Sequence, residues 1–149
     1  RVNIQSAEEL FNVVKENSAG KDYIIMSAAV SDYKPKQKYD GKMKKSASDE
    51  INIELTKTMD ILKYLGENKK GYKLIGFALE TSSELEYAKK KLSDKNLDMI
   101  VVNNPKVKGA GFGTDTNVIT IIDKKGNATP YEKMSKFEGA GVILSQMQK

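Results

Sequence analysis

The sequence predicts an α/β protein whose sheet is mostly parallel and flanked by helices. Short, almost continuously apolar runs alternate with amphipathic segments, and several of these segments open with the Ser-x-x-Glu pattern of a helix N-terminus. Buried strands that alternate with helices form βαβ units, in which the strands run parallel. Ligands bind at the carboxyl ends of such strands. The residues that end each apolar run are therefore the first candidates for a functional site.

Three apolar runs predict strands that are buried on both faces, at residues 23–30, 74–79 and 99–102. Two weaker strands are expected at residues 51–55, where apolar and polar positions alternate, and at residues 118–122, before a turn at 125–127. A doubly wound sheet usually has five or more buried strands. We therefore expect this sheet to be incomplete.

Four helices are expected from their N-terminal caps. In a capping box, a Ser side chain accepts from the amide three residues on, and the Glu at that position reaches back. Such boxes pair Ser6 with Glu9, Ser83 with Glu86, and Ser135 with Glu138. The helix expected after Ser6 has an apolar stripe along one side, with which it can pack against a core. Thr58 is expected to cap a short helix that carries Ile61, Leu62 and Leu65.

Composition limits both size and chemistry. The 149 residues, 39% of them hydrophobic, fit one domain (1–149), and no apolar run reaches the roughly 18 residues of a membrane span. The sequence has no Cys and no His, which excludes disulfides, Cys- or His-ligated metals and a Ser-His-Asp triad. The lack of Cys fits a reducing cytoplasm. The chain starts at Arg1, with neither Met nor a signal peptide, and we expect it to be a fragment.

A lysine-rich loop is the strongest charge signal. The formal net charge is +5, and residues 31–50 lack periodicity but hold Lys34, Lys36, Lys38, Lys42, Lys44 and Lys45. Ammonium groups in such a loop can close over a triphosphate and neutralise charge at a phosphoryl centre. The loop can equally be a solvated surface, and charge alone does not separate these interpretations. Aromatic and basic residues are not closely interleaved in the sequence, so we do not expect nucleic acid as a partner.

Other polar residues near predicted strand ends or on helices have two interpretations each. Asp32 can bind a ribose hydroxyl, a base amine or Mg²⁺, or it can cap a helix. Glu80 and Thr81 allow the same alternatives. Lys91 and Lys95 share a helix face, and by themselves they indicate only surface lysines.

Short motifs occur in order along nearly the whole chain. They are Ala28-Ala29-Val30-Ser31-Asp32-Tyr33, Lys42-Met43-Lys44-Lys45, Leu55-Thr56-Lys57-Thr58-Met59-Asp60-Ile61-Leu62, Gly76-Phe77-Ala78-Leu79-Glu80-Thr81, Lys95-Asn96-Leu97-Asp98, Asn103-Asn104 and Gly111-Phe112-Gly113-Thr114-Asp115-Thr116-Asn117. Together they resemble phosphopantothenoylcysteine synthetase, also called phosphopantothenate–cysteine ligase. The resemblance implies a Rossmann-like fold and a homodimer, with a small dimerisation sheet around residues 51–55.

The resemblance also implies a reaction in coenzyme A biosynthesis. CTP would activate 4′-phosphopantothenate to an acyl-cytidylate with loss of pyrophosphate, and cysteine would then attack to give the amide and CMP. Mg²⁺ would assist, through ligands that the sequence leaves unknown. In bacteria this synthetase is usually the C-terminal half of a bifunctional protein, fused to a decarboxylase domain. FMN would belong only to that decarboxylase domain, which these residues do not include.

The resemblance assigns residues to a nucleotide site. It implies that Lys42 and Lys45 are catalytic, as part of a lysine motif on a flap over the triphosphate. Asp32 would recognise the nucleotide, and Phe77 would lie against the cytosine. The other implied nucleotide contacts are Met26, Ser27, Ala28, Met59, Asp60, Ile61, Leu62, Lys91 and Lys95.

The start of the chain departs from the family pattern. The family's Gly-Gly-Thr strand and its Asn-Ser-Ser-Gly-containing loop have no match here. We therefore expect the chain to lack the N-terminal βαβ unit and part of the substrate pocket. A nucleotide-binding module without catalysis is the alternative interpretation. A short-chain dehydrogenase is disfavoured, because Tyr87 and Lys91 have its Tyr-x-x-x-Lys spacing but no GxxxGxG loop accompanies them.

Overall fold

The structure, a computed structural model, describes residues 1–39, 41–42, 51–79, 84–103, 107, 110 and 113–148. The chain divides into two compact units. Unit 1 consists of Arg1–Asn17 and Ala29–Asp60, and unit 2 consists of Ser18–Ala28 and Ile61–Lys149. That the whole chain acts as one synthetase domain stays a prediction.

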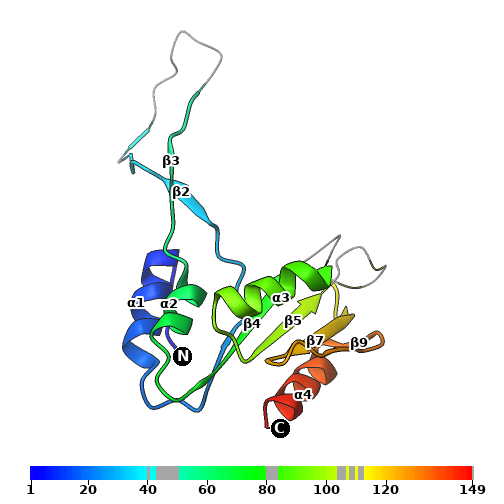
Figure 1. The fold of residues 1–149 in the computed structure, drawn as a ribbon. Coiled ribbons are helices and arrows are strands. Elements are labelled where there is room, and N and C mark those ends of the chain that lie inside the picture. Colours follow the sequence, from blue (N-terminus) through cyan, green and yellow to red (C-terminus); the bar gives the residue numbers. More distant parts are fainter. Residues whose placement is uncertain are drawn as a thin grey trace. The chain divides into compact units, whose positions relative to one another are not determined.

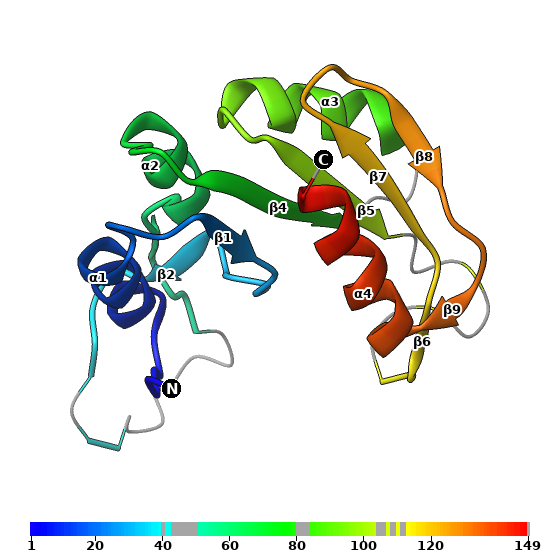
Figure 2. The ribbon, with the colours of Figure 1, turned by 90° about the horizontal axis from the view of Figure 1, so that it is seen from below.

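Unit 2 contains a five-stranded sheet with the strand order β1-β4-β5-β7-β8. Figure 1 labels its strands β4, β5 and β7, and Figure 2 labels all five. The strands are β1 (Tyr23–Met26), β4 (Lys73–Leu79), β5 (Met99–Asn103), β7 (Ile119–Asp123) and β8 (Ala128–Pro130). β1, β4 and β5 run parallel, whereas β7 and β8 pair antiparallel. The predicted turn joins β7 to β8, with Gly126 at φ 84°, and so short a connection permits only antiparallel pairing. The predicted α/β fold is confirmed.

Helices cover both faces of this sheet (Figure 2). α4 (Lys136–Met147) packs on one face, over a core cluster of Ile75, Met99, Val101, Ile119, Ile121, Ile143 and Met147. α2 (Ile61–Glu67) and α3 (Glu84–Asp94) cover the other face. Successive residues of a strand point to opposite faces, so two covered faces explain the continuous burial predicted for β4 and β5.

The first strand differs from its prediction. It spans Tyr23–Met26 rather than residues 23–30, and Ile25 is 40% exposed instead of buried. In the described part of the sheet β1 pairs only with β4 and forms an edge. An apolar run predicts a strand, but only the tertiary structure determines which other elements cover the two faces of that strand.

Unit 1 consists of a helix and a hairpin, and its details correct three predictions. α1 (Ala7–Asn17) has no fully buried residue, and the apolar residues of its predicted stripe, Leu10, Phe11, Val13 and Val14, are half-buried. The Glu9 amide donates to the Ser6 hydroxyl at 3.2 Å as predicted, but the Glu9 carboxylate accepts from the Gln5 amide instead. The hairpin pairs β2 (Tyr33–Pro35), inside the predicted loop, with β3 (Leu55–Lys57), which starts where the predicted strand was to end.

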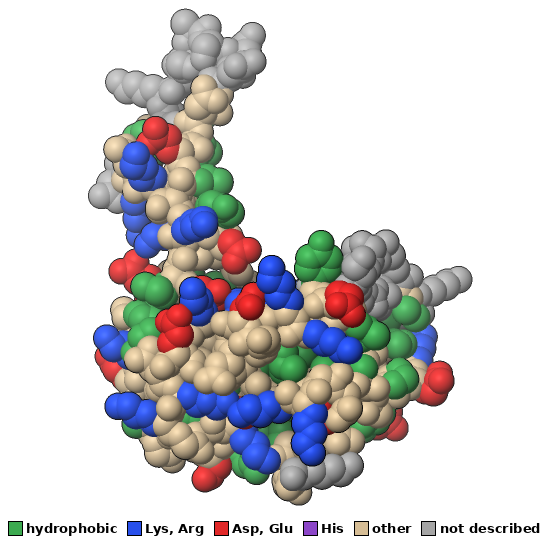
Figure 3. Space-filling model, viewed as in Figure 1, with side chains coloured by type: hydrophobic (Ala, Val, Ile, Leu, Met, Phe, Trp, Pro, Cys, Tyr) green, Lys and Arg blue, Asp and Glu red, His purple; other side chains and the backbone are tan. Residues whose placement is uncertain are grey.

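The hairpin exposes an apolar face (Figure 3). Pro35 is level with Leu55 and Tyr33 with Lys57, so these residues share one face, while Lys34 and Thr56 share the other. Tyr33 is 51% and Leu55 57% exposed, and Ile53, two residues before Leu55, is 65% exposed. Figure 3 shows hydrophobic side chains, in green, along the hairpin.

The C-terminal helix confirms its predicted capping box. The Glu138 amide donates to the Ser135 hydroxyl at 3.1 Å, and the Ser135 amide donates to the Glu138 carboxylate at 2.8 Å. Hydrogen bonds from Ser135 hold the pKa of the Glu138 carboxyl below its usual value. A short ribbon of β6 (Thr116–Asn117) and β9 (Met134–Ser135) leads into α4. No helix in the described ranges has the length and apolar character needed to cross a membrane.

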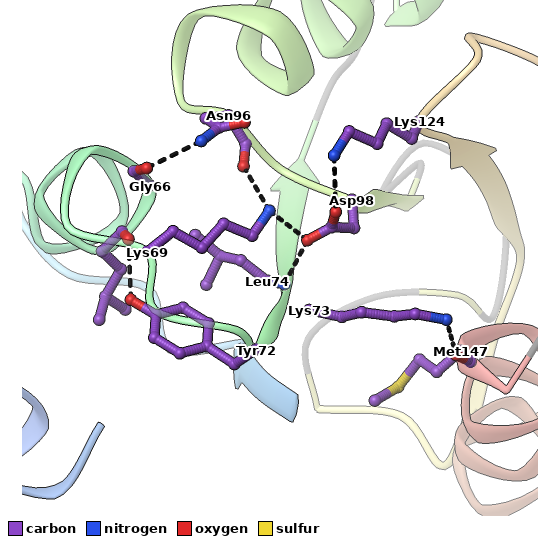
Figure 4. A network of polar contacts seen from close by, with 10 residues as sticks. Gly66, Lys69, Tyr72, Lys73, Leu74, Asn96, Asp98, Lys124 and Met147 are labelled. Carbon is purple, nitrogen blue, oxygen red and sulfur yellow. Dashed lines mark hydrogen bonds and ion pairs between the residues drawn. The ribbon is translucent and has the colours of Figure 1, made fainter. Parts of the chain in front are cut away.

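A charged network joins the amino ends of β4 and β5 (Figure 4). The Asp98 side chain is 17% exposed, and its carboxylate accepts from the Leu74 amide at 2.7 Å, from the Lys124 ammonium at 3.1 Å and from the Lys69 ammonium. Burial raises the pKa of Asp98, but the hydrogen bonds from Lys69, Leu74 and Lys124 outweigh it and leave the pKa below its ordinary value. Ionised Asp98 therefore stabilises the fold.

We expect Asp98→Asn to lower the free energy of unfolding by roughly 2 kcal/mol at neutral pH, because it leaves the mostly buried Lys69 without its counter-charge. The folded-state pKa lies below the unfolded value near 4, so this contribution is complete above about pH 4 and is lost as the pH falls through the folded pKa. Urea unfolding at about pH 7 and pH 3 measures both effects. Asp94→Asn, at an exposed position of α3, is the matched control. Equal stability of the two variants at neutral pH would contradict the prediction.

Candidate functional site

Two adjacent strand ends in unit 2 bring together residues that the resemblance assigns to a nucleotide. Met26 ends β1 and is level with Gly76 of β4. Ser27 and Ala28 follow Met26 as exposed residues, and Phe77 follows Gly76 in the neighbouring strand. The 26–28 segment therefore lies beside Phe77 at the carboxyl ends of parallel strands, where ligands bind in sheets of this kind.

Phe77 is anchored on one side and accessible on the other. It is half-buried and packs against the core cluster beneath α4. A ring held in this way can offer its remaining surface to a flat ligand without losing much conformational freedom.

Gly76 sets the distance between α2 and the strand end. A Cβ at this position would lie 2.9 Å from the Leu62 side chain and 2.9 Å from the Leu97 side chain, closer than real Cβ contacts. Leu62 is half-buried and Ile61 is 4% exposed, so packing occupies most of both side chains. Ile61 and Leu62 could therefore contact a nucleotide through their backbone groups.

In unit 1, hydrogen bonds hold two more predicted segments side by side. The Thr58 amide donates to the Asp32 carbonyl at 2.9 Å, and the Thr58 hydroxyl donates to the Ser31 carbonyl at 2.5 Å. Asp32 is exposed and Met59 is 57% exposed, so both can meet a ligand. Thr58 was predicted to cap α2. That prediction is wrong, because its hydroxyl serves the 31–33 segment instead.

A cavity of about 430 Å³ adjoins this pair of segments within unit 1. Met59, Thr58, Lys57 and Lys34 line one side of it, and the first turns of α1 line the other. Lys34 is paired with Glu8 at 3.0 Å. Neither Lys57 nor Glu8 was a candidate from the sequence, because no local pattern reveals the register that sets Lys57 level with Tyr33 or the ion pair of Glu8 with Lys34.

The lysine motif is described only at its first residue. Lys42 is exposed and follows Gly41, whose φ of 121° favours glycine. Lys44 and Lys45 lie outside the described residues. The structure is therefore consistent with an accessible Lys42 and does not test the motif as a whole.

Lys91 and Lys95 belong to the far end of α3. Lys91 lies in the last turn and Lys95 just beyond it, both half-buried, and the Lys95 amide donates to the Lys91 carbonyl at 3.1 Å. The chain then enters the amino end of β5, opposite to the strand ends at Ser27 and Phe77. The structure does not bring these lysines to that end of the sheet, and their nucleotide contact stays a prediction.

Several other candidates cannot be placed. Glu80, Thr81 and Asn104 lie outside the described residues, whereas Asn103 ends β5 level with Leu79. Asp60 is exposed at the end of unit 1. No group of three acidic side chains suited to a metal ion occurs in the part of the chain that the structure describes. We therefore assign Mg²⁺ no protein ligand.

Comparison with known proteins supplies the family. The whole chain, residues 1–149, matches the family described as DNA/pantothenate metabolism flavoprotein C-terminal domain. The coenzyme A biosynthesis bifunctional protein CoaBC of Bacillus subtilis (strain 168) is 45% identical over 144 residues, which are 97% of this chain and 35% of that protein. A cysteine/cysteine sulfinic acid decarboxylase from an unknown prokaryotic organism is 44% identical over 147 residues, or 98% of this chain and 41% of that protein.

A solved structure agrees with these relatives. The crystal structure of the C-terminal domain of CoaBC matches with a TM-score of 0.78 at 42% identity, covering 99% of this chain and 65% of that one. The fold and the strand-end residues thus define a Rossmann-like α/β protein. The chain belongs to the family of the DNA/pantothenate metabolism flavoprotein C-terminal domain, and the predicted resemblance to the synthetase half of the bifunctional proteins is confirmed. It spans about a third to two fifths of the length of these curated relatives.

Proposed function

We propose that this chain carries the nucleotide-handling part of a ligase that joins 4′-phosphopantothenate to cysteine, with CTP as the activating nucleotide. The register of β1 and β4, which sets exposed Ser27 and Ala28 beside Phe77, is the observation that carries the proposal. The family and the CoaBC relatives support a role in coenzyme A biosynthesis. A decarboxylase domain that uses FMN would be a separate part of a longer protein.

The proposed reaction has two steps. A carboxylate oxygen of 4′-phosphopantothenate attacks the α-phosphorus of CTP, and pyrophosphate leaves. The amine of cysteine then attacks the acyl carbon of the acyl-cytidylate, the acyl carbon–oxygen bond breaks, CMP leaves, and a proton goes to solvent. Both nucleophiles come from substrates, which suits a sequence without His or Cys. The protein would supply positioning and positive charge.

The family resemblance suggests a role for each candidate residue. The backbone at Met26, Ser27 and Ala28 would read the exocyclic groups of the base, and Phe77 would lie against its face. The Asp32 carboxylate would accept from a ribose hydroxyl or a base amine, and the Lys42 ammonium would neutralise phosphate charge. Mg²⁺ would be bound by triphosphate oxygens, which are the hard ligands this ion prefers.

A nucleotide-binding module without catalysis is the second candidate. The observation in its favour is that the candidate residues placed by the structure are all assigned to the nucleotide, and none of them to 4′-phosphopantothenate or cysteine. The two candidates differ in one measurement, the release of pyrophosphate from CTP in the presence of 4′-phosphopantothenate. A ligase releases it, and a binding module does not.

We expect CTP to bind at least about tenfold more tightly than ATP, because a base that covers the backbone groups of the 26–28 segment without pairing them leaves them unsatisfied, which costs roughly 1–3 kcal/mol. Isothermal titration calorimetry measures both affinities. Phe77→Leu should weaken CTP binding roughly 5- to 20-fold through lost stacking. Phe137→Leu is the matched control, since Phe137 is 89% exposed on α4. Equal affinities for CTP and ATP would refute the proposed base recognition.

Lys42→Ala should slow acyl-cytidylate formation by about a hundredfold or more, since it removes a cation worth roughly 3 kcal/mol at a developing phosphate charge. The position is exposed, so the fold is not at stake. Pyrophosphate release in the active full-length protein measures the step. Lys38→Ala, an exposed lysine of the same segment, is the control for net loop charge. A Lys42→Ala rate as high as that of the control would mean that the loop is a solvated surface.

We also propose that the β2–β3 hairpin mediates a homodimer. Tyr33, Pro35 and Leu55 form one face of the hairpin, and Tyr33 and Leu55 are more than half exposed. Exposed apolar side chains that lie next to one another are typical of interaction surfaces. A second copy of the same hairpin would bury this face.

The paired substitution Ile53→Glu with Leu55→Glu should convert the dimer to a monomer, because both side chains are exposed in this chain and would be buried in the dimer. Sedimentation velocity measures the state. Thr56→Glu adds a charge to the opposite face of the same strand and should leave the dimer intact. Dimers that persist in the double variant would place the interface elsewhere.

A further inference from the structure

A second cavity lies at the opposite end of the unit 2 sheet from Ser27 and Phe77. Its volume is about 400 Å³, and the amino ends of β4 and β5, the β7–β8 turn and the end of α4 surround it. Its floor consists of four side chains that are at most 5% exposed: Ile75, Met99, Ile121 and Met147. The proposed reaction does not use this cavity, and the one lining residue that belongs to a motif quoted above is Asp98, which ends Lys95-Asn96-Leu97-Asp98.

The rim of the cavity is charged. Lys73, Lys124 and Lys125 line it, together with Asp98 and Asp123. Three positive charges against two negative ones leave an excess of one positive charge over an apolar floor.

Both aspartates are already satisfied by the protein. Asp98 accepts from Leu74, Lys69 and Lys124, as Figure 4 shows. One Asp123 oxygen accepts from the amides of Lys125 and Asn127, each at 2.9 Å, and the other accepts from the Asn127 side chain at 2.8 Å. These hydrogen bonds, that of the Asn127 side chain foremost, lower the pKa of Asp123. The two carboxylates therefore have few lone pairs left for a cation, and the remaining polar side chains of the lining, Asn127, Thr129 and Gln146, are uncharged.

The lysines, in contrast, retain donors. The Lys73 ammonium donates to the Met147 carbonyl at 2.8 Å, and the Lys124 ammonium donates to Asp98. An ammonium has three N–H groups, so each of these lysines keeps donors beyond the contact drawn in Figure 4. Lys125 is exposed in the turn beside them. A ligand at this rim meets N–H donors and net positive charge.

We infer that this cavity binds a small amphiphilic monoanion, namely an aliphatic chain that ends in a carboxylate. The chain would lie on the apolar floor, where the flexible Met99 and Met147 side chains can adapt to its shape. The carboxylate would accept from the rim lysines, and its single charge matches their excess of one. This inference is independent of the proposed ligase activity, since it uses the opposite end of the sheet.

Methionine methyl groups separate the two ends of the sheet in one NMR experiment. The 149-residue chain is labelled with ¹³C-methyl methionine and titrated with octanoate. Met99 and Met147 line the cavity, whereas Met26 and Met59 report on the proposed nucleotide contacts. We expect saturable shifts at Met99 and Met147 and none at Met26 and Met59. No saturable shift at the cavity methyls, or equal shifts at all four, would overturn the inference.

Charge recognition is tested separately. Octanol, which has the same chain without the charge, should bind at least about tenfold more weakly. The double variant Lys124→Gln with Lys125→Gln should weaken octanoate binding about three- to tenfold or more. The Lys124 side chain is 65% exposed, and Asp98 keeps Lys69 and the Leu74 amide as partners without it, so the variant should fold. Lys90→Gln at an exposed position of α3 is the control. Octanol that binds as tightly as octanoate, or an octanoate affinity unchanged in the double variant, would overturn the assignment of an anionic ligand.

Discussion

The pairing of β4 with a parallel strand on each side is the interaction on which unit 2 depends. Its register with β1 and β5 aligns the three strands so that their carboxyl ends lie at one edge and their amino ends at the other. Gly76 lets α2 approach the strand closely, and Ile75 contributes to the core beneath α4. At the amino end, the Asp98 carboxylate accepts from the Leu74 amide of β4. One strand thus fixes both layers of helices and both ends of the sheet.

The two ends of the sheet differ in chemistry. At the carboxyl end, the small exposed residues Ser27 and Ala28 leave the backbone approachable, and Phe77 offers an anchored ring. At the amino end, ionised side chains lock strands, loops and helix ends together. A fixed charge network resists rearrangement because removing one partner leaves the other charge desolvated. The amino end is thus rigid and holds its lysines in fixed positions, whereas the carboxyl end offers backbone groups and an aromatic ring to a ligand.

Unit 1 shows how a hairpin assembles distant residues. Asp32 and Met59 are far apart in the sequence. The antiparallel pairing of β2 and β3, with the hydrogen bonds of Thr58, brings them together. The same pairing puts Tyr33 and Leu55 on one exposed face. A single register therefore sets both the candidate ligand contacts of this unit and its candidate dimer surface.

The sequence by itself determined the features that depend on neighbours along the chain. The apolar runs of β4 and β5, the Ser135–Glu138 box and the turn at Gly126 are local, and each was predicted correctly. The ordered motifs were also sufficient to identify the family. Phe77 became a candidate only through those motifs, because nothing in its local pattern distinguishes a ligand contact from a core residue. Asp32 was a candidate from its place near a strand end, but only the motifs favoured a ligand contact over a helix cap.

Only the tertiary structure decided the features that depend on residues far apart in the sequence. The exposure of Ile25, the register of β2 with β3 and the network of Lys69, Asp98 and Lys124 each require partners that no local periodicity reveals. The cavity at the amino end of the sheet likewise combines the start of β4 with the end of α4. The physical reason is that hydrogen bonds and packing act through space, whereas periodicity reports only on the chain's own turn or pleat.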